Sequence, residues 1–159
     1  MATKTTKKKG ETATTVSVGI RIDPKIKFAL DLMGRLQKRS LTAVIEWAIS
    51  NAISQQVGGP DGSAVSEIVD NVWSTDDAVR FVNLCYHLPE ALTYDELRTW
   101  ETIKASKIFW KNDRLDRNQD ALLISSVQDY WEDILEFTEK HRSNSTVKAI
   151  TFEDLPTPF

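Results

Sequence analysis

The chain has 159 residues, of which 41% are hydrophobic and 27% charged, a composition typical of a globular protein with one ordinary domain or two small ones. Its formal net charge of −3 conceals an asymmetry: residues 1–57 hold ten Lys and Arg against four acids, and residues 58–159 hold ten against nineteen. A basic first part (net +6) and an acidic second part (net −9) indicate two modules with different partners.

The cysteine count and the hydropathy pattern exclude several classes. The single cysteine, Cys85, rules out a disulfide or a cysteine-based metal cluster within one chain. The basic N-terminal residues lack the apolar run of a signal peptide, and no stretch is long enough to cross a bilayer. We therefore expect a cytoplasmic, nucleoid-associated protein with no membrane partner.

The first elements are a polar arm and a strand. Residues 1–14 are rich in Lys and Thr without periodicity, which predicts a flexible basic arm. Over 15–22, branched apolar residues occupy every second position, which predicts a strand with one apolar and one polar face. The apolar residues are Val16, Val18, Ile20 and Ile22, and they alternate with Thr15, Ser17, Gly19 and Arg21.

Two amphipathic helices follow the strand. Asp23 is a candidate N-cap with Pro24 at the first helical position, and apolar residues at helical spacing predict a helix to about residue 37. Ser40 is the candidate N-cap of a second helix, whose apolar stripe continues to Ile53. The segment VGGPDGS over 57–63 predicts a linker, so we expect domains at 15–56 and 64–142.

The second part of the chain is expected to be an acidic helical bundle. Apolar periodicity predicts helices over 65–72 and 78–88, a third behind the capping box at Thr93 and Glu96 that carries Trp100 and Trp110, and a last one over about 119–141. The last helix has its apolar residues at alternating spacings of four and three, which fits either a coiled-coil seam or ordinary bundle packing. Residues 143–159 are a tail in which 147–152 either pair as a strand or stay loose.

A single strand raises a physical problem, because its backbone N–H and C=O groups have no partner within hairpin distance. Two copies of the chain solve it by pairing their strands antiparallel about a two-fold axis. The apolar face then lies on the four helices of the dimer, and the polar face points outward. A two-stranded ribbon of this kind fits the major groove of DNA.

The run VSVGIRIDPKIKFALDLMGRLQKRSLTAVIEWAISNAI resembles a ribbon-helix-helix DNA-binding domain, the fold of Arc- and MetJ-type repressors and of many antitoxins. The matching features are the alternating strand, the Asp-Pro helix start, the basic QKRS turn and the Ser-Leu-Thr opening of the second helix. The resemblance covers residues 15–56. It implies a dimeric domain of one strand and two helices. Together with the helical bundle that the apolar periodicity predicts after the linker, we expect a mainly α chain.

The resemblance also implies which residues contact DNA. Ser17, Gly19 and Arg21 occupy the ribbon positions that face the bases, and Arg21 is the residue able to bind guanine in bidentate fashion. Ser17 is able to add a weaker contact. Gly19 departs from the pattern, because it has no side chain to read a base: either it lets the backbone lie closer to the DNA, or the ribbon reads little sequence. The phosphate contacts are expected from the second helix's start and from the arm: Lys38, Arg39, Ser40, Leu41, Thr42, Lys7, Lys8 and Lys9.

No catalytic constellation is visible in the second part. Cys85 and His87, with His141 as the other histidine, cannot fill a structural zinc site, and no Gly-rich phosphate loop, nucleophile elbow or HExxH motif occurs. We expect no enzyme activity, metal or cofactor, and a module for oligomerisation or binding of a protein partner.

Two kinds of function follow. One is a homodimeric transcriptional regulator that binds double-stranded DNA through the ribbon. The other is an antitoxin, whose C-terminal domain neutralises a protein partner, or a plasmid partition or conjugation accessory protein. Antitoxin C-terminal regions are usually short and loosely folded, which argues mildly against the antitoxin for a Trp-rich second part of about 80 residues.

Overall fold

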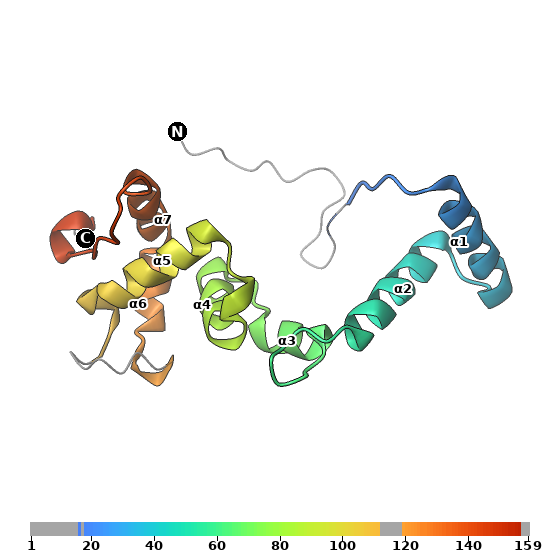
Figure 1. The fold of residues 1–159 in the computed structure, drawn as a ribbon, viewed down its shortest axis with the longest axis horizontal. Helices are drawn as coiled ribbons and strands as arrows, with labels where there is room; N and C mark the ends of the chain where they lie inside the picture. The colour runs from blue at the N-terminus through green and yellow to red at the C-terminus, as the bar shows by residue number, and fades with distance from the viewer. Residues whose placement is uncertain (1–15, 17, 112–118, 157–159) are drawn as a thin grey trace. The chain divides into compact units, whose positions relative to one another are not determined.

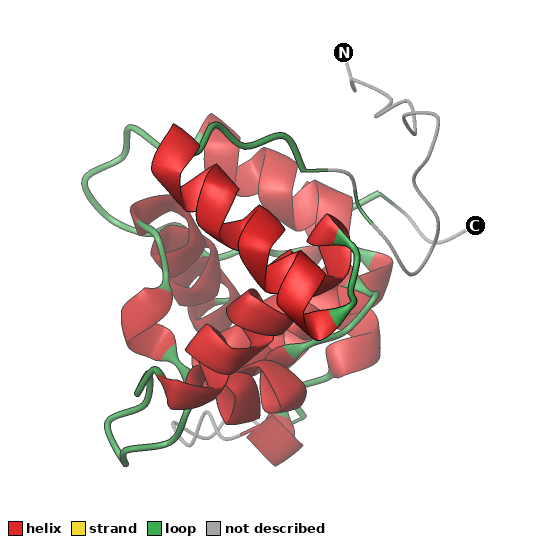
Figure 2. Cartoon of the chain, turned by 90° about the vertical axis from the view of Figure 1, so that its right-hand side faces the viewer, coloured by secondary structure: helices red, strands yellow, loops and turns green. Residues whose placement is uncertain are grey.

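The computed structural model describes residues 16, 18–111 and 119–156, and it is mainly α (Figures 1 and 2). Within the described residues, β-pairing is limited to the isolated bridges Val57–Ala64 and Trp110–Leu122. Two compact units make up the chain, Met1–Ser50 and Asn51–Phe159. The α-helices are α1 (Pro24–Gln37), α2 (Leu41–Gln55), α3 (Val65–Val72), α4 (Asp77–His87), α5 (Tyr94–Ala105), α6 (Ile124–Asp129) and α7 (Trp131–Lys140).

Helix α1 begins as the sequence predicts. The Asp23 carboxylate accepts a hydrogen bond from the N–H of Lys25 at 2.8 Å, and Pro24 takes the first helical position. Proline loses no hydrogen bond there, because the first N–H groups of a helix have no partner within it. One turn later, Lys27 and Asp31 form an exposed ion pair at 2.6 Å with i,i+4 spacing.

A tight turn joins α1 to α2. Lys38 has a left-handed backbone (φ 54°), and the N–H of Arg39 donates to the carbonyl of Gly34 at 2.9 Å, which closes the end of α1. A Cβ on Gly34 would lie 3.0 Å from the carbonyl oxygen of Arg39, so the chain folds back closely over this glycine. The Ser40 hydroxyl accepts the N–H of Ala43 at 3.2 Å and caps α2, which confirms the second helix start.

The described residues of the expected strand do not form a strand. Of residues 15–22, Val16 and 18–22 are described, and they form neither a helix nor a β-bridge. A strand exists only through hydrogen bonds to a neighbouring strand, and the described residues of one chain provide none for this segment.

The second unit has an aromatic core between its helices. Trp100 of α5 packs edge-on against Phe81 of α4, with ring centroids 6.5 Å apart, and lies 6.3 Å from Trp110. Cys85 is 4% exposed and belongs to this core, as its place on the apolar stripe predicts. Helices α3 and α5 start as expected, α5 with the Thr93–Glu96 capping box. Ser74 or Thr75 is the cap that the sequence predicts for α4, but the cap is Asp76, so the helix begins at Asp77.

Two predicted helices are shorter than expected. The helix expected to carry Trp110 ends at Ala105, because the buried Ser106 turns the chain: its hydroxyl donates to the carbonyl of Thr102 at 2.6 Å and accepts the N–H of Ile150 at 2.7 Å. A 3₁₀ turn follows, η2 (Lys107–Phe109), and the Trp110 indole N–H then donates back to the carbonyl of Ile103 at 2.9 Å.

The prediction of one continuous helix over 119–141 is also wrong. It is divided into the 3₁₀ turn η3 (Gln119–Ala121), α6 and α7, with Tyr130 between the two α-helices. The break excludes a continuous coiled-coil seam. The apolar spacing still predicts the buried side, since Val127 and Ile134 are both 0% exposed.

The C-terminal segment completes the core of the second unit. Residues 147–152 contain no strand, and their backbone is held by the Ile150–Ser106 bond rather than by a sheet. Ile150 and Leu155 are 1% and 8% exposed, on either side of the 3₁₀ turn η4 (Phe152–Asp154). The core therefore depends on residues far apart in the sequence.

Candidate nucleic-acid interface and dimer face

The apolar residues of the predicted ribbon are uncovered in the single chain. Val16, Val18, Ile20 and Ile22 are 75%, 74%, 61% and 38% exposed. Their alternation is that of a strand with one buried face. Exposure of these branched apolar side chains to water is unfavourable, so this face requires a cover that the described residues do not supply.

The helices of the first unit show the same deficit. Among the described residues of this unit, only Gly34 and Val44 are buried. The exposed large apolar residues of α1 and α2 in this unit are Ile26, Phe28, Leu32, Leu36, Trp47 and Ile49. Two helices that bury one large side chain cannot offset the conformational entropy of folding. The described residues of this unit therefore do not form a core of their own.

Two residues expected to read bases, Gly19 and Arg21, alternate with the apolar residues of this segment. Arg21 is exposed, two residues before the N-cap of α1. Gly19 is exposed too, and a Cβ placed on it would meet nothing within 4 Å. Internal packing therefore does not require a glycine at this position. Ser17 lies outside the described residues.

The expected phosphate-binding residues gather at the start of α2. Lys38, Arg39, Ser40 and Thr42 are exposed, and Leu41 is half-buried as the first residue of the helix. The first intrahelical bond is donated by Val44 to Ser40 at 3.0 Å, so the N–H groups of residues 41 and 42 precede the helical ladder. Backbone N–H groups and the positive end of the helix dipole favour an anion at such a place.

The structure adds one residue to this group. Arg35, in the last turn of α1, lines a shallow depression together with Lys38 and Arg39 of the turn, and Leu30, Gly34 and Leu41 form much of its floor. The one acid lining it, Asp31, is paired with Lys27. Arg35 is not among the residues predicted from the sequence, although its spacing of three before Lys38 is the available signal. The arm residues Lys7, Lys8 and Lys9 lie outside the described residues.

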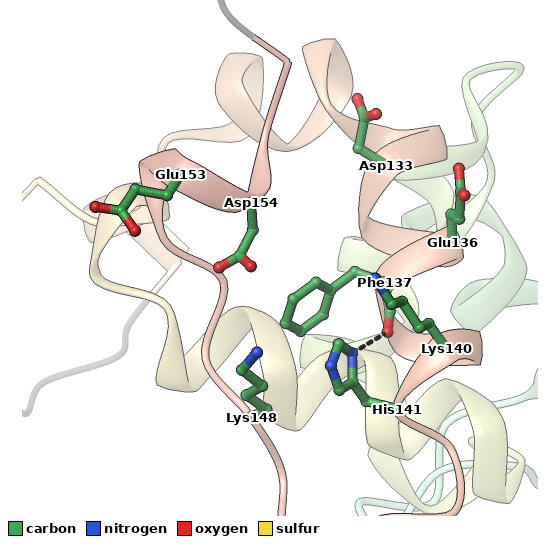
Figure 3. Close-up of a pocket in the computed structure, with 8 residues that line it drawn as sticks. All are labelled: Asp133, Glu136, Phe137, Lys140, His141, Lys148, Glu153 and Asp154. Carbon is green, nitrogen blue, oxygen red and sulfur yellow. Dashed lines mark hydrogen bonds between the residues drawn. The ribbon is translucent and has the colours of Figure 1, made fainter.

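The second unit has a separate depression lined by α7 and the C-terminal segment (Figure 3). His141 donates from Nδ1 to the carbonyl of Phe137 at 2.8 Å, and the Lys148 ammonium lies 5.5 Å from the centre of the Phe137 ring. The Asp154 carboxylate accepts hydrogen bonds from the backbone and the hydroxyl of Thr151, which lower its pKa. These groups stabilise the local structure, and their charges are mixed in sign.

Cys85 and Asp76 of the second unit both lie in structural surroundings. Burial raises the pKa of the Cys85 thiol to about 12, so the residue stays protonated and is a poor nucleophile. Among the described residues, no group of three or more His, Cys, Asp or Glu side chains is placed to hold a metal ion. Asp76, near Asp77 at the start of α4, caps the helix by accepting the N–H of Val79 at 2.9 Å.

None of the helices in the described part of the chain combines the length and the hydrophobicity that a membrane span needs. No protein-family model, curated protein sequence or solved structure matches the chain. The interpretation of the site therefore depends on its own residues and geometry.

Proposed function

We propose that the protein is a homodimeric DNA-binding protein of the ribbon-helix-helix kind, which acts as a transcriptional regulator. The observation that carries this proposal is the exposed apolar face of the first unit, with Val16, Val18 and Ile20 each more than 60% exposed. A segment with this alternation is built to be buried on one face, and only a second strand satisfies its backbone at the same time.

A second copy of the chain is the partner that fits this face best. Two identical strands paired antiparallel about a two-fold axis bury both apolar faces against the four helices of the dimer. The same pairing satisfies the backbone N–H and C=O groups of residues 16–22. It also places two copies of Arg21 on the outer face of the ribbon.

The charges of the first unit favour DNA as the ligand. Arg35, Lys38 and Arg39 line one depression with Leu41, the first residue of α2, and Arg21 belongs to the predicted ribbon. In the proposed complex the ribbon enters the major groove, and the start of α2 binds a backbone phosphate on either side. Arg21 supplies the base contact, whereas the other cations supply affinity that falls as salt rises.

Binding to a pool of random duplex DNA at two salt concentrations, followed by sequencing of the retained fraction, tests this proposal. We expect enrichment of a short palindromic or repeated motif. Arg21→Ala should weaken binding to that motif by about 1–3 kcal/mol and relax the base preference. Arg142→Ala removes the same charge from the second unit and serves as the matched control.

Deletion of residues 1–12 distinguishes the contribution of the arm to DNA binding from that of the ribbon. It should weaken binding to all sequences and flatten the salt dependence, because the arm supplies phosphate contacts only. Retention of DNA without any enriched motif would indicate an architectural protein. If neither the deletion nor Arg21→Ala changes DNA affinity, the ribbon proposal is wrong.

A further inference from the structure

A groove of about 450 Å³ lies in the second unit between α3, α4, α5 and α7. Its apolar lining is Val72, Phe81, Leu84, Trp131 and Leu135. The rings of Phe81 and Trp131 contact each other with centroids 5.1 Å apart and planes tilted by 45°, and Leu135 remains 38% exposed. The groove thus offers two packed aromatic rings and an aliphatic side chain still in water.

An exposed Trp–Arg pair adjoins the groove. Trp73 directly follows α3 and is 64% exposed, and the guanidinium of Arg80, which lines the groove, lies 5.3 Å from the centre of its ring. The same guanidinium donates to the carbonyl of Ser74 at 2.7 Å and is thereby fixed in place. Tryptophan and arginine are the residues most enriched among the energetically dominant positions of protein interfaces.

The remaining charged groups of the groove are acidic. Asp77, Asp95 and Glu96 line it, and Glu96 is engaged in the capping box of α5. Asp77 pairs with Arg80, and Asp95 pairs with Arg142 at 2.9 Å, but the side chains of both acids are more than half exposed. Exposed ion pairs of this kind stabilise a protein little, so an incoming cation can replace the arginine at low cost.

The shape and the charge together select the occupant. The described part of this unit has no strand whose edge a peptide could extend, and a groove between helices receives the apolar face of another helix. A second copy of this unit would bring a net charge of −9 against the same sign, which disfavours self-association here. A basic partner meets complementary charge instead.

We propose that this groove is a docking site for an amphipathic helix of a partner protein, with an apolar face that covers Leu135 and Trp131 and with basic flanks that face Asp77 and Asp95. The proposal does not depend on DNA binding by the first unit. It assigns the second unit a protein-binding surface at a defined place.

The test uses the full chain and a synthetic amphipathic helix with a Leu face and Lys flanks, and measures binding by fluorescence anisotropy of the labelled peptide. Leu135→Ala should weaken binding about tenfold. Ile124→Ala is the matched control, since Ile124 is 36% exposed and lies outside the groove, and it should leave binding unchanged. A peptide with the same Leu face and Glu flanks should bind at least tenfold more weakly.

The charge is tested with a second pair of variants. Asp77→Asn with Asp95→Asn should weaken the Lys-flanked peptide and reduce its salt dependence, whereas Asp129→Asn with Glu153→Gln removes two acids elsewhere and should do neither. Circular dichroism verifies that each variant is folded. Equal losses for Leu135→Ala and Ile124→Ala, equal binding of the two peptides, or self-association of the chain that Leu135→Ala abolishes would each overturn the proposal. Arg21→Ala should leave peptide binding unchanged, which keeps this test separate from that of DNA binding.

Discussion

Replacing Ile20 with alanine tests whether a second copy covers the apolar face of the ribbon. Ile20 is 61% exposed in the single chain. Complete burial of an isoleucine side chain contributes about 1.5–3 kcal/mol, so covering the exposed part contributes roughly 1–2 kcal/mol per copy. Both copies change in a symmetric dimer, and alanine retains only the Cβ. We therefore expect the dimer to lose about 2–3 kcal/mol, which raises its dissociation constant roughly 30- to 150-fold.

Sedimentation equilibrium of the full chain over a range of concentrations measures this constant. Phe152→Ala is the control, because Phe152 is 78% exposed but lies in the second unit, and it should leave the dissociation constant unchanged. If the chain were a monomer with Ile20 in water, the substitution would change its stability by no more than about 0.5 kcal/mol. A monomeric wild-type protein, or an unchanged constant for Ile20→Ala, would refute the reasoning.

Three further predictions concern single side chains. Lys38→Gly should raise the stability of the first unit by about 0.5–1 kcal/mol in chemical denaturation, because Lys38 has a positive φ that glycine adopts without strain; a loss of stability would contradict this. Ser40→Ala removes the cap on the N–H of Ala43 and should lower the free energy of unfolding by about 1 kcal/mol. Ser40→Asp keeps the cap but repels phosphate, so it should retain stability and lose DNA affinity. Unchanged DNA affinity of Ser40→Asp would remove the start of α2 from the DNA interface. The raised pKa of Cys85, about 12 against an ordinary 9.0, means that the native state holds the thiol proton more tightly than the unfolded state. The contribution of this thiol to stability should therefore decline as the pH rises from 9.0 towards 12, and Cys85→Ala should reduce that decline. Labelling of Cys85 by a thiol reagent at pH 8 should require unfolding of the second unit.

The helix starts are the part of the fold that local sequence encodes well. The sequence predicts the first turns of α1, α2 and α5 as the structure shows them. The signals are Asp23 with Pro24 for α1, Ser40 for α2, and Thr93 with Glu96 for α5. In each case the hydrogen bond that starts the helix joins residues two or three positions apart. Such a signal is complete within a few residues, so no tertiary contact is needed to read it.

The helix ends in the second unit depend on contacts that the local pattern does not contain. Ser106 ends the third helix of this unit because its hydroxyl bonds to Ile150, 44 residues further on. Trp110 leaves the helical spacing because its indole bonds back to Ile103. The apolar periodicity predicts which side chains are buried, but it does not distinguish a continuous helix from two helices separated at Tyr130.

The sequence of the ribbon predicts a buried face that the described residues of one chain do not form. Alternation with period two specifies a face that must be buried, and the described residues leave that face in water. A Cβ on Gly19 would meet nothing within 4 Å in the described chain. In the proposed dimer the missing Cβ instead lets the ribbon backbone approach the base edges more closely. Gly19 reads no base itself, so direct specificity in that dimer comes mainly from the two copies of Arg21, with a weaker contribution from Ser17. We expect the sequence-dependent deformability of the DNA to contribute the rest.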